Sequence, residues 1–404
     1  MAADTATTRA RAMHQAPAME LAELIADRQT RIVVCCGAGG VGKTTTSAAL
    51  GLAAAEAGRT VVVLTIDPAR RLAQSLGLTE LDNEPRKVDV PGAPGQLHAM
   101  MLDMKRTFDD IVTAHSTPER AQQILENPFY QALSSSFAGT QEYMAMEKLG
   151  QLRASDQWDL IIVDTPPSRS ALDFLDAPNR MGRFLDGTMI RLLMAPSRAG
   201  FKFASAGFLF FSRIISKILG GQLLRDISAF VSALDTMFGG FRERATATFE
   251  LLRRSGTWFV VVAAPEPDAL REASYFVDRL SAEGMPLAGL VVNRTHPPAT
   301  TSLSATRAEG AAEEVAESGG DGAGLAAAAL RVHAERMQLA TREQHLADRF
   351  TSAHPDVALR TVPAAAGDVH DLEGLRTMAA ALTGPDHDTP TGTPRTRVLP
   401  ARRG

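Results

Sequence analysis

A strand, a glycine-rich loop and a helix follow one another between residues 31 and 56, and this succession constrains the fold more than any other feature. Residues 32–35 are apolar and suit a buried strand. Residues 37–44 fit the pattern G-x-x-x-x-G-K-[ST], and an alanine- and leucine-rich stretch typical of a helix follows them. A chance glycine turn before a helix is the alternative, but the order of the three parts argues against it. The succession predicts an α/β fold with an anion site at the start of the helix.

Each residue type in this loop has a role in holding phosphate. Glycines let backbone N–H groups turn toward phosphates without a side chain in the way. Lys43 is expected to neutralise the β- and γ-phosphate oxygens, and the Thr44 hydroxyl to bind Mg²⁺. The predicted phosphate-binding residues are Gly37, Gly39, Gly40, Val41, Gly42, Lys43, Thr44 and Thr45.

Composition favours a globular enzyme that does not bind nucleic acid. The 404 residues are 45% hydrophobic, which suffices for one large α/β domain with an insertion or for two domains. A net charge of -4 argues against nucleic acid as a partner, because its binding depends on basic surface. We find no signal-peptide core and no uncharged apolar run of the roughly 20 residues that span a bilayer. We therefore expect a cytoplasmic protein.

The two cysteines, Cys35 and Cys36, are adjacent on the first predicted strand. Neighbouring side chains of a strand point to opposite faces, which disfavours a mutual disulfide or a shared metal site. We expect buried thiols in a reducing compartment.

Strands and helices alternate along the chain, which is typical of a doubly wound, mostly parallel sheet. Helical patterns cover residues 19–28, 105–125, 141–153, 325–350 and 371–382. After the first strand, apolar runs predict strands at residues 60–66, 97–101, 158–164, 257–263, 287–292 and 357–362.

Changes in composition divide the chain into five segments. Eleven of the 17 phenylalanines lie between Phe174 and Phe249, which marks a separate helical insertion. The expected segments are a disordered N-terminus (1–16), the first part of the core (17–169), the helical insertion (170–255), the second part of the core (256–383, with a flexible surface excursion at 296–324) and a disordered tail (384–404).

Two aspartates at strand ends are candidates for the chemistry. Asp164 closes an apolar strand, where a carboxylate can hold Mg²⁺ through water. An aspartate that caps the next helix is the alternative. Asp67 ends the second strand, where it can orient an attacking water, although spacing alone leaves this role open.

Three motifs in combination resemble a known family. Residues 37–45 (GAGGVGKTT), 65–69 (TIDPA) and 164–168 (DTPPS) are similar to the deviant phosphate-loop ATPases of the ArsA family. This family includes the arsenite-pump ATPase and the guided-entry ATPase that delivers tail-anchored membrane proteins. The chain most resembles the single-copy ArsA-like proteins of actinobacteria. Weaker similarities at residues 263–267, 291–294 and 362–372 extend the resemblance over most of residues 30–383.

The resemblance implies ATP and Mg²⁺ as cofactors and assigns roles to single residues. Asp67 matches the switch I aspartate that activates water, and Asp164 the switch II aspartate near Mg²⁺. Glu266 matches a glutamate that contacts the nucleotide or the opposite subunit, and Asn293 the asparagine that reads the adenine edge. An Asn amide has the donor and acceptor that this reading needs, although Asn by itself is more typical of a turn.

The sequence departs from the family in three ways. Ala38 replaces the signature lysine, which usually reaches across a dimer to the partner's phosphates. Either another cation such as Arg169 substitutes for it, or a lysine-bearing paralogue completes a heterodimer, or the chain hydrolyses ATP slowly. With Cys35 and Cys36 alone, the chain has no CxxC pair for the zinc clamp of the tail-anchor branch. It also lacks the arsenite-binding cysteines. We therefore expect no bound zinc and no transport of arsenite.

The insertion contains an amphipathic pattern at residues 207–219. Phe210, Phe211 and Ile215 would line a groove for a hydrophobic client helix, as the insertion does in the tail-anchor branch. An ordinary core or dimer-interface helix is the better-supported alternative, and peripheral membrane contact is a third.

The sequence thus predicts an ArsA-like ATPase that hydrolyses MgATP with Asp67 positioning water. Hydrolysis would open and close a homodimer, or a heterodimer with an ArsA-like paralogue, that handles a hydrophobic or membrane-protein client. The alternative is a regulatory or scaffolding subunit that binds ATP with little turnover, because Ala38 removes the signature charge.

Overall fold

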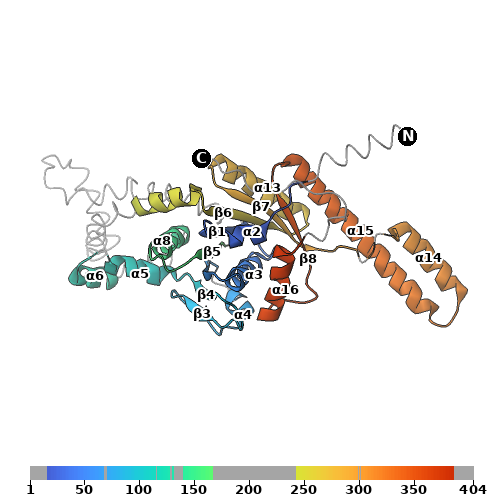
Figure 1. The fold of residues 1–404 in the computed structure, drawn as a ribbon, viewed down its shortest axis with the longest axis horizontal. Helices are drawn as coiled ribbons and strands as arrows, with labels where there is room; N and C mark the ends of the chain where they lie inside the picture. The colour runs from blue at the N-terminus through green and yellow to red at the C-terminus, as the bar shows by residue number, and fades with distance from the viewer. Residues whose placement is uncertain are drawn as a thin grey trace, which may run out of the picture.

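The structure, a computed structural model, describes residues 16–67, 71–114, 116–127, 130–131, 140–166, 243–298, 300 and 302–385. Its centre is an eight-stranded sheet in the order β3-β4-β2-β5-β1-β6-β7-β8 (Figure 1). All neighbouring strands are parallel except β3 and β4, which confirms the predicted α/β fold. The strands are β1 (Ile32–Gly37), β2 (Thr60–Thr65), β3 (Arg86–Val88), β4 (Gln96–Met101), β5 (Leu160–Asp164), β6 (Thr257–Ala263), β7 (Leu287–Thr295) and β8 (Leu359–Pro363).

Helices connect and cover these strands. Residues 243–253 form a further helix at the end of the expected insertion. The rest of that insertion, with Phe210, Phe211 and Ile215, lies outside the described residues, as does Arg169. The helices are α2 (Leu21–Ala26), α3 (Lys43–Glu56), α4 (Arg71–Ser75), α5 (Met104–Ala114), α6 (Pro118–Leu125), α8 (Thr140–Ala154), α13 (Pro267–Ala282), α14 (Ala305–Ser318), α15 (Ala323–Ala353) and α16 (Leu372–Thr383).

The order of the strands places a crevice next to β1. From β1 the chain passes through α3 to β2 on one side, whereas from β6 it passes through α13 to β7 on the other. Because such crossovers are right-handed, α3 and α13 cover opposite faces of the sheet. In sheets of this kind, ligands bind at the carboxyl ends of the strands where the two directions diverge. The glycine-rich loop follows β1 at this point.

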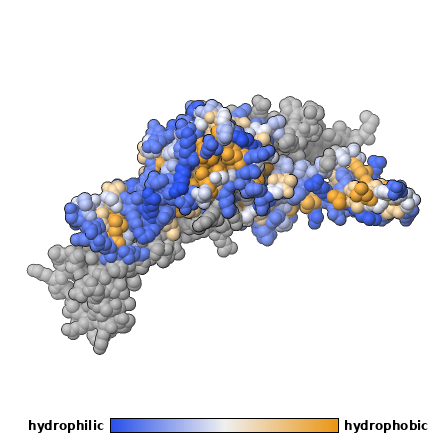
Figure 2. Space-filling view, turned by 90° about the horizontal axis from the view of Figure 1, so that it is seen from below, coloured by the Kyte–Doolittle hydropathy of each residue, from blue (hydrophilic) through white to orange (hydrophobic). Residues whose placement is uncertain are grey.

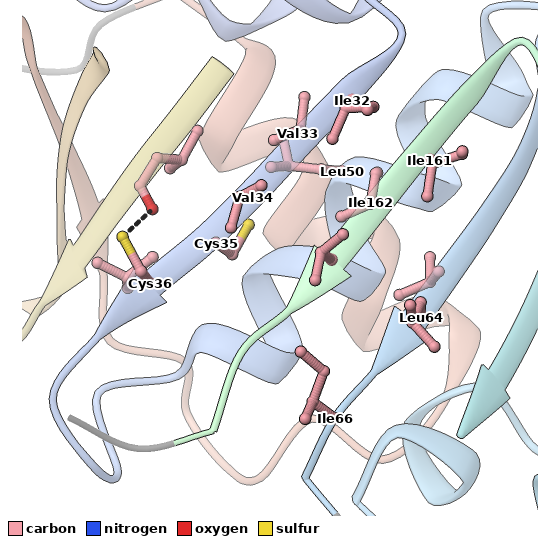
Figure 3. Close-up of a cluster of buried hydrophobic side chains, with 14 of the residues drawn as sticks. Ile32, Val33, Val34, Cys35, Cys36, Leu50, Leu64, Ile66, Ile161 and Ile162 are labelled. Carbon is pink, nitrogen blue, oxygen red and sulfur yellow. Dashed lines mark hydrogen bonds between the residues drawn. The ribbon is translucent and has the colours of Figure 1, made fainter. Parts of the chain in front are cut away.

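The strands at the centre of the sheet are completely buried. All six residues of β1 and all five of β5 are buried, as expected for parallel strands covered on both faces. Figure 3 shows apolar side chains on both sides of β1, with Cys35 and Cys36 on opposite faces. Both thiols are free, and burial raises the pKa of Cys35 to about 12 and raises that of Cys36 as well.

Two elements differ from the sequence prediction because of local capping and edge effects. Strand β3 was not expected, since its three residues include Arg86 and Lys87 and lack an apolar pattern. Charged residues are typical of such an edge strand. The single helix expected over residues 105–125 is two helices. Thr117 caps the second one by accepting a hydrogen bond from the Arg120 N–H, and Pro118 opens it.

The stretch expected to be a flexible excursion, residues 296–324, contains helix α14 instead. Ser304 caps this helix by accepting a hydrogen bond from the Arg307 N–H, and Gly319 ends it with a φ of 62°. Most residues between these caps are alanine and glutamate, which are strong helix formers. The serines and glycines that indicated flexibility are therefore the two ends of a helix.

Helices α14 and α15 form a hairpin that projects from the body of the molecule (Figure 1). We call residues 305–342 the arm. Within the arm the two helices pack through small side chains, since the buried residues between 305 and 342 are Ala308, Ala312, Ala327 and Ala334. Apolar residues also gather on the surface of the arm, between polar ones (Figure 2). Among the described residues, no helix is both long enough and apolar enough to cross a membrane.

A buried arginine ties together the segments at the amino ends of the strands. Arg59 at the start of β2 is only 1% exposed. Its Nη1 and Nη2 donate hydrogen bonds of 2.5–3.1 Å to the carbonyl oxygens of Ile25, Asp27, Thr30 and Asp159.

Replacing Arg59 should therefore destabilise the fold. Arg59→Met leaves four carbonyl oxygens without their donor, and we expect the free energy of unfolding to fall by on the order of 3 kcal/mol or more. Arg28 pairs with Asp159 from a side chain that is 63% exposed, so Arg28→Met should lower it by less than about 1 kcal/mol. Urea unfolding followed by circular dichroism measures both values. Similar losses in the two variants would contradict the role given to Arg59.

Candidate active site

The glycine-rich loop joins β1 to α3 and lies tightly against the neighbouring strands. Gly37, Gly40 and Gly42 have φ angles of 147°, 77° and 95°, which favour glycine. A Cβ at Gly37 would lie 2.0 Å from the carbonyl oxygen of Val262, and a Cβ at Gly42 would lie 2.3 Å from Nδ2 of Asn293. Glycine is therefore required at both ends of the loop by close contacts with β6 and β7.

Lys43 folds back over the loop. Its Nζ donates a hydrogen bond of 2.7 Å to the carbonyl oxygen of Ala38, and the residue is only 7% exposed. Burial lowers the pKa of Lys43, and the negative charge of Asp164 opposes this shift. An ammonium group has two more N–H donors. Gly39 and Gly40 are exposed at the tip of the loop, so phosphate oxygens can approach from this side.

Asp164 is a fully buried carboxylate at the end of β5. Its Oδ2 accepts hydrogen bonds from the hydroxyls of Thr44, at 2.7 Å, and Thr65, at 2.9 Å. Its Oδ1 is buried and has no hydrogen-bond partner in the part of the chain that the structure describes. Burial raises the pKa of Asp164 to about 6, although the two hydroxyls and Lys43 act in the opposite direction.

These groups fit a magnesium ion. Mg²⁺ prefers oxygen ligands and keeps several waters, and the Thr44 hydroxyl contacts the carboxylate of Asp164, whose other oxygen has no partner among the described residues. The described residues contain no group of three or more His, Cys, Asp or Glu side chains that could hold a metal ion. Thr44 and Asp164 would therefore hold Mg²⁺ together with phosphate oxygens and water.

Asp67 lies at the same edge of the sheet, two residues beyond β2, and is half-buried. It is close enough that its charge contributes to raising the pKa of Asp164 and opposes the lowering of that of Lys43. The structure thus brings Lys43, Thr44, Asp67 and Asp164 together at one edge. Their roles in catalysis stay predictions.

Asn293 contacts the phosphate loop rather than solvent. Its Nδ2 donates a hydrogen bond of 2.8 Å to the carbonyl oxygen of Val41, and the residue is 5% exposed. The sequence prediction did not include this contact, and the role of Asn293 toward adenine stays a prediction. Glu266 is exposed just before α13, and its side chain does not cap that helix.

Thr65 is a site residue that sequence reasoning missed. It lies opposite Asp164 in the register of the paired strands β2 and β5. The only signal was a hydroxyl residue two positions before Asp67. That signal has meaning only when the order of the strands is known, and neither propensity nor spacing predicts that order.

Comparisons with known proteins identify the family to which this chain belongs. Residues 30–312, more than half of the chain, match the family of anion-transporting ATPases, also called ArsA ATPases. The chain is 26% identical to the ATPase get3 of Neurospora crassa over 70% of this chain and 77% of that protein. It is 26% identical to the ATPase GET3B of Arabidopsis thaliana over 70% of this chain and 68% of that protein. It is 25% identical to the ATPase GET3 of Malassezia globosa over 69% of this chain and 77% of that protein.

Two glycine substitutions separate backbone strain from steric contact in the loop. Gly42→Ala adds strain and a clash with the Asn293 amide, so we expect no measurable binding of ATP with Mg²⁺. Gly40→Ala has similar strain, with a φ of 77°, but its Cβ would meet no atom within 4 Å. The affinity of the Gly40→Ala variant for ATP with Mg²⁺ should fall by about tenfold at most, which corresponds to roughly 1.4 kcal/mol of binding free energy. Isothermal titration calorimetry on folded variants measures both, and equal losses would contradict the tight contact at Asn293.

Asp164 should make the stability of the nucleotide-free chain depend on pH. Its pKa of about 6 in the folded chain exceeds the ordinary value of 3.8, so the folded state binds a proton there more tightly. The stabilisation is present below about pH 4 and is lost as the pH rises through about 6. Relative to Asp164→Asn, the wild type should lose roughly 2–3 kcal/mol of unfolding free energy between about pH 4 and 7. Urea unfolding at both pH values, without nucleotide or metal, tests this. A difference between the two proteins that does not change with pH would contradict it.

Proposed function

Because the chain belongs to the family of anion-transporting ATPases, we propose that it binds and hydrolyses MgATP at the carboxyl edge of its sheet. One observation carries the proposal: the Thr44 hydroxyl contacts the buried Asp164 carboxylate, whose second oxygen has no partner in the described part of the chain. A buried carboxylate without a full set of partners is unfavourable unless a cation completes the site. Its place beside the phosphate loop favours Mg²⁺ bound together with a nucleotide.

Each residue of the proposed site has a separate role in binding or hydrolysing the nucleotide. The backbone N–H groups of the loop and the Lys43 ammonium bind the phosphate oxygens and hold the nucleotide in place. Thr44 and Asp164 would hold Mg²⁺, which neutralises charge on the β- and γ-phosphates when bound. Asp67 would orient the attacking water by accepting a hydrogen bond from it at the carboxylate.

We further propose that hydrolysis opens and closes a dimer, either of two identical chains or with an ArsA-like paralogue. Asp67 follows β2 and Asp164 is the last residue of the adjacent strand β5, so both can respond to the presence of the γ-phosphate. Glu266 lies exposed at the same edge, where it can contact the nucleotide or the second subunit. The resemblance to the ArsA family, which includes the tail-anchor branch, supports a hydrophobic or membrane-protein client, with Phe210, Phe211 and Ile215 as its contact surface. We place this activity in the cytoplasm.

A second candidate is a regulatory subunit that binds ATP but hydrolyses little of it alone. Ala38 favours this function, because it offers no charge at the position of the signature lysine. The nearby Lys43 ammonium donates a hydrogen bond to the backbone carbonyl oxygen of residue 38 within the subunit's own loop. Transition-state charge would then have to come from another chain.

Steady-state ATP hydrolysis by the purified chain, beside its Asp67→Asn and Lys43→Ala variants, tests the proposed ATPase. We expect turnover in the wild type and a loss of at least a hundredfold in both variants, since each removes a group that acts on the transition state. Calorimetric binding of ATP should survive in Asp67→Asn and fail in Lys43→Ala. Arg271→Ala is a matched control, because that exposed side chain pairs only with Asp268 among the described residues.

The outcome also separates the two candidates. A wild type that binds ATP with Mg²⁺ but turns over no faster than Asp67→Asn contradicts a self-sufficient ATPase and supports the regulatory subunit. A wild type that binds no ATP contradicts both.

A further inference from the structure

The peptide group that joins Val41 to Gly42 is held on one side by a side chain from a distant strand. Nδ2 of Asn293, at the end of β7, donates a hydrogen bond of 2.8 Å to the carbonyl oxygen of Val41. The carbonyl and the N–H of a trans peptide lie in one plane and point in opposite directions. The bond from Asn293 therefore turns the N–H of Gly42 away from β7.

This N–H group is the first donor at the N-terminal end of α3. Gly42 directly precedes the helix, and its N–H makes no hydrogen bond to any other residue in the part of the chain that the structure describes. The first N–H groups of a helix have no partner within the helix, and the helix dipole makes this end attractive to anions. The direction of the Gly42 N–H therefore matters for binding a phosphate.

The same glycine makes the peptide group easy to turn. Rotation of the group changes the ψ angle of Val41 and the φ angle of Gly42 together, and glycine accepts positive and negative φ about equally well. In the structure Gly42 has a φ of 95°. Its own residue type does not select this orientation, so a contact from outside the loop is needed to favour it.

Asn293 is suited to this task because it is itself confined. It is 5% exposed, and it pairs with Val362 of β8 at the last position before the irregularity in the pairing of these strands. Its amide lies so close to the loop that a Cβ at Gly42 would be 2.3 Å from Nδ2. The amide is thus enclosed between the strand that carries it and the loop that it contacts.

We infer that Asn293 is a positioning residue of the phosphate loop, which holds the peptide group after Val41 so that the Gly42 N–H points to the bound phosphate. The inference rests on the proposed function, in which the phosphates of a nucleotide bind at this loop. In this role Asn293 acts through the loop and does not need to touch the nucleotide. Its loss should weaken every ligand that binds through phosphates, with or without a base. A residue that only reads adenine would affect adenine nucleotides alone.

Inorganic tripolyphosphate, which has no base, tests this role by titration calorimetry on the full chain. Asn293→Leu keeps a side chain of similar size and removes the donor to Val41. With Mg²⁺ present, we expect the affinities of this variant for tripolyphosphate and for ATP to fall by the same factor, about tenfold or more. Circular dichroism checks that the variant is folded.

Asn293→Asp gives a second measurement, with a readout that a purely structural role would not change. At about pH 8 the new carboxylate cannot donate to Val41, and both ligands should bind about tenfold more weakly than to the wild type, or weaker still. Burial raises the pKa of a carboxyl group, and its protonated form can donate an O–H to the same carbonyl oxygen. The ratio of wild-type to variant affinity should therefore shrink by about threefold or more between about pH 8 and 5.5.

Two comparisons make the pH result specific. The charged side chains near the loop, Lys43, Asp67 and Asp164, are the same in wild type and variant, so the ratio of affinities isolates the substitution. Asn127→Asp is a matched control after α6. There the Oδ1 accepts a hydrogen bond from the N–H of Tyr130, which a carboxylate can also accept. Its affinities should equal those of the wild type at both pH values.

Four results would overturn the inference. The first is a loss of ATP affinity in Asn293→Leu with an unchanged affinity for tripolyphosphate, as expected of a residue that only reads the base. The second is an unchanged affinity for both ligands. The third is a wild type that binds ATP but no tripolyphosphate, since the loop would then not hold phosphates by itself. The fourth is a ratio for Asn293→Asp that does not change with pH, and this result decides if Asn293→Leu does not fold.

The same titrations separate this inference from the proposed function. A wild type that binds tripolyphosphate but neither binds nor hydrolyses ATP contradicts the proposed ATPase, and Asn293→Leu then still tests the positioning role on tripolyphosphate. A wild type that hydrolyses ATP, beside an Asn293→Leu variant with unchanged affinities, supports the ATPase and overturns the positioning role.

Discussion

The carboxylate of Asp164 is the point at which the parts of this molecule depend on one another. One of its oxygens accepts hydrogen bonds from Thr44 at the start of α3 and from Thr65 at the end of β2. A fully buried carboxylate is unfavourable unless such partners are placed accurately around it. The pairing of β2 with β5 sets Thr65 directly opposite Asp164, and the tight turn at Gly42 sets Thr44. The sheet register and the loop conformation are therefore both conditions for a usable site.

Local rules predicted the elements that lie wholly in the core. The buried strands β1, β5 and β6 are long apolar runs, so their composition alone identifies them. The phosphate loop was predictable for a different reason, because its glycines are required by backbone geometry rather than by tertiary contacts alone. Local rules failed where a charged edge strand or a helix cap decided the outcome. Strand β3 and helix α14 are the two examples: pairing with β4 forms the strand despite its charged residues, and the cap at Ser304 begins a helix in a stretch whose serines and glycines suggested flexibility.

Contacts between distant segments were beyond prediction, and the end of β7 shows why. Asn293 reaches the carbonyl oxygen of Val41, and three residues later His296 contacts Glu343 of α15 through its backbone N–H and its Nδ1, both at 2.7 Å. Between them, Arg294 has a φ of 62° at an irregularity in the pairing of β7 with β8. No spacing in the sequence indicates these partners. They nevertheless form a continuous series of contacts from the phosphate loop to the base of the arm.

The balance of charge at the loop gives a physical reason for both magnesium and a second subunit. The carboxylates whose charges act on Lys43 are Asp164, Asp67 and Glu272, and Ala38 adds no positive charge to oppose them. ATP brings further negative charge, so free nucleotide would be repelled by this excess at short range. Mg²⁺ would relieve the repulsion from within the site, and a cation presented by another chain would relieve it from outside. A cation from another chain would act on the same negative excess as Mg²⁺, so each would reduce the gain from the other, and both would favour binding of the nucleotide.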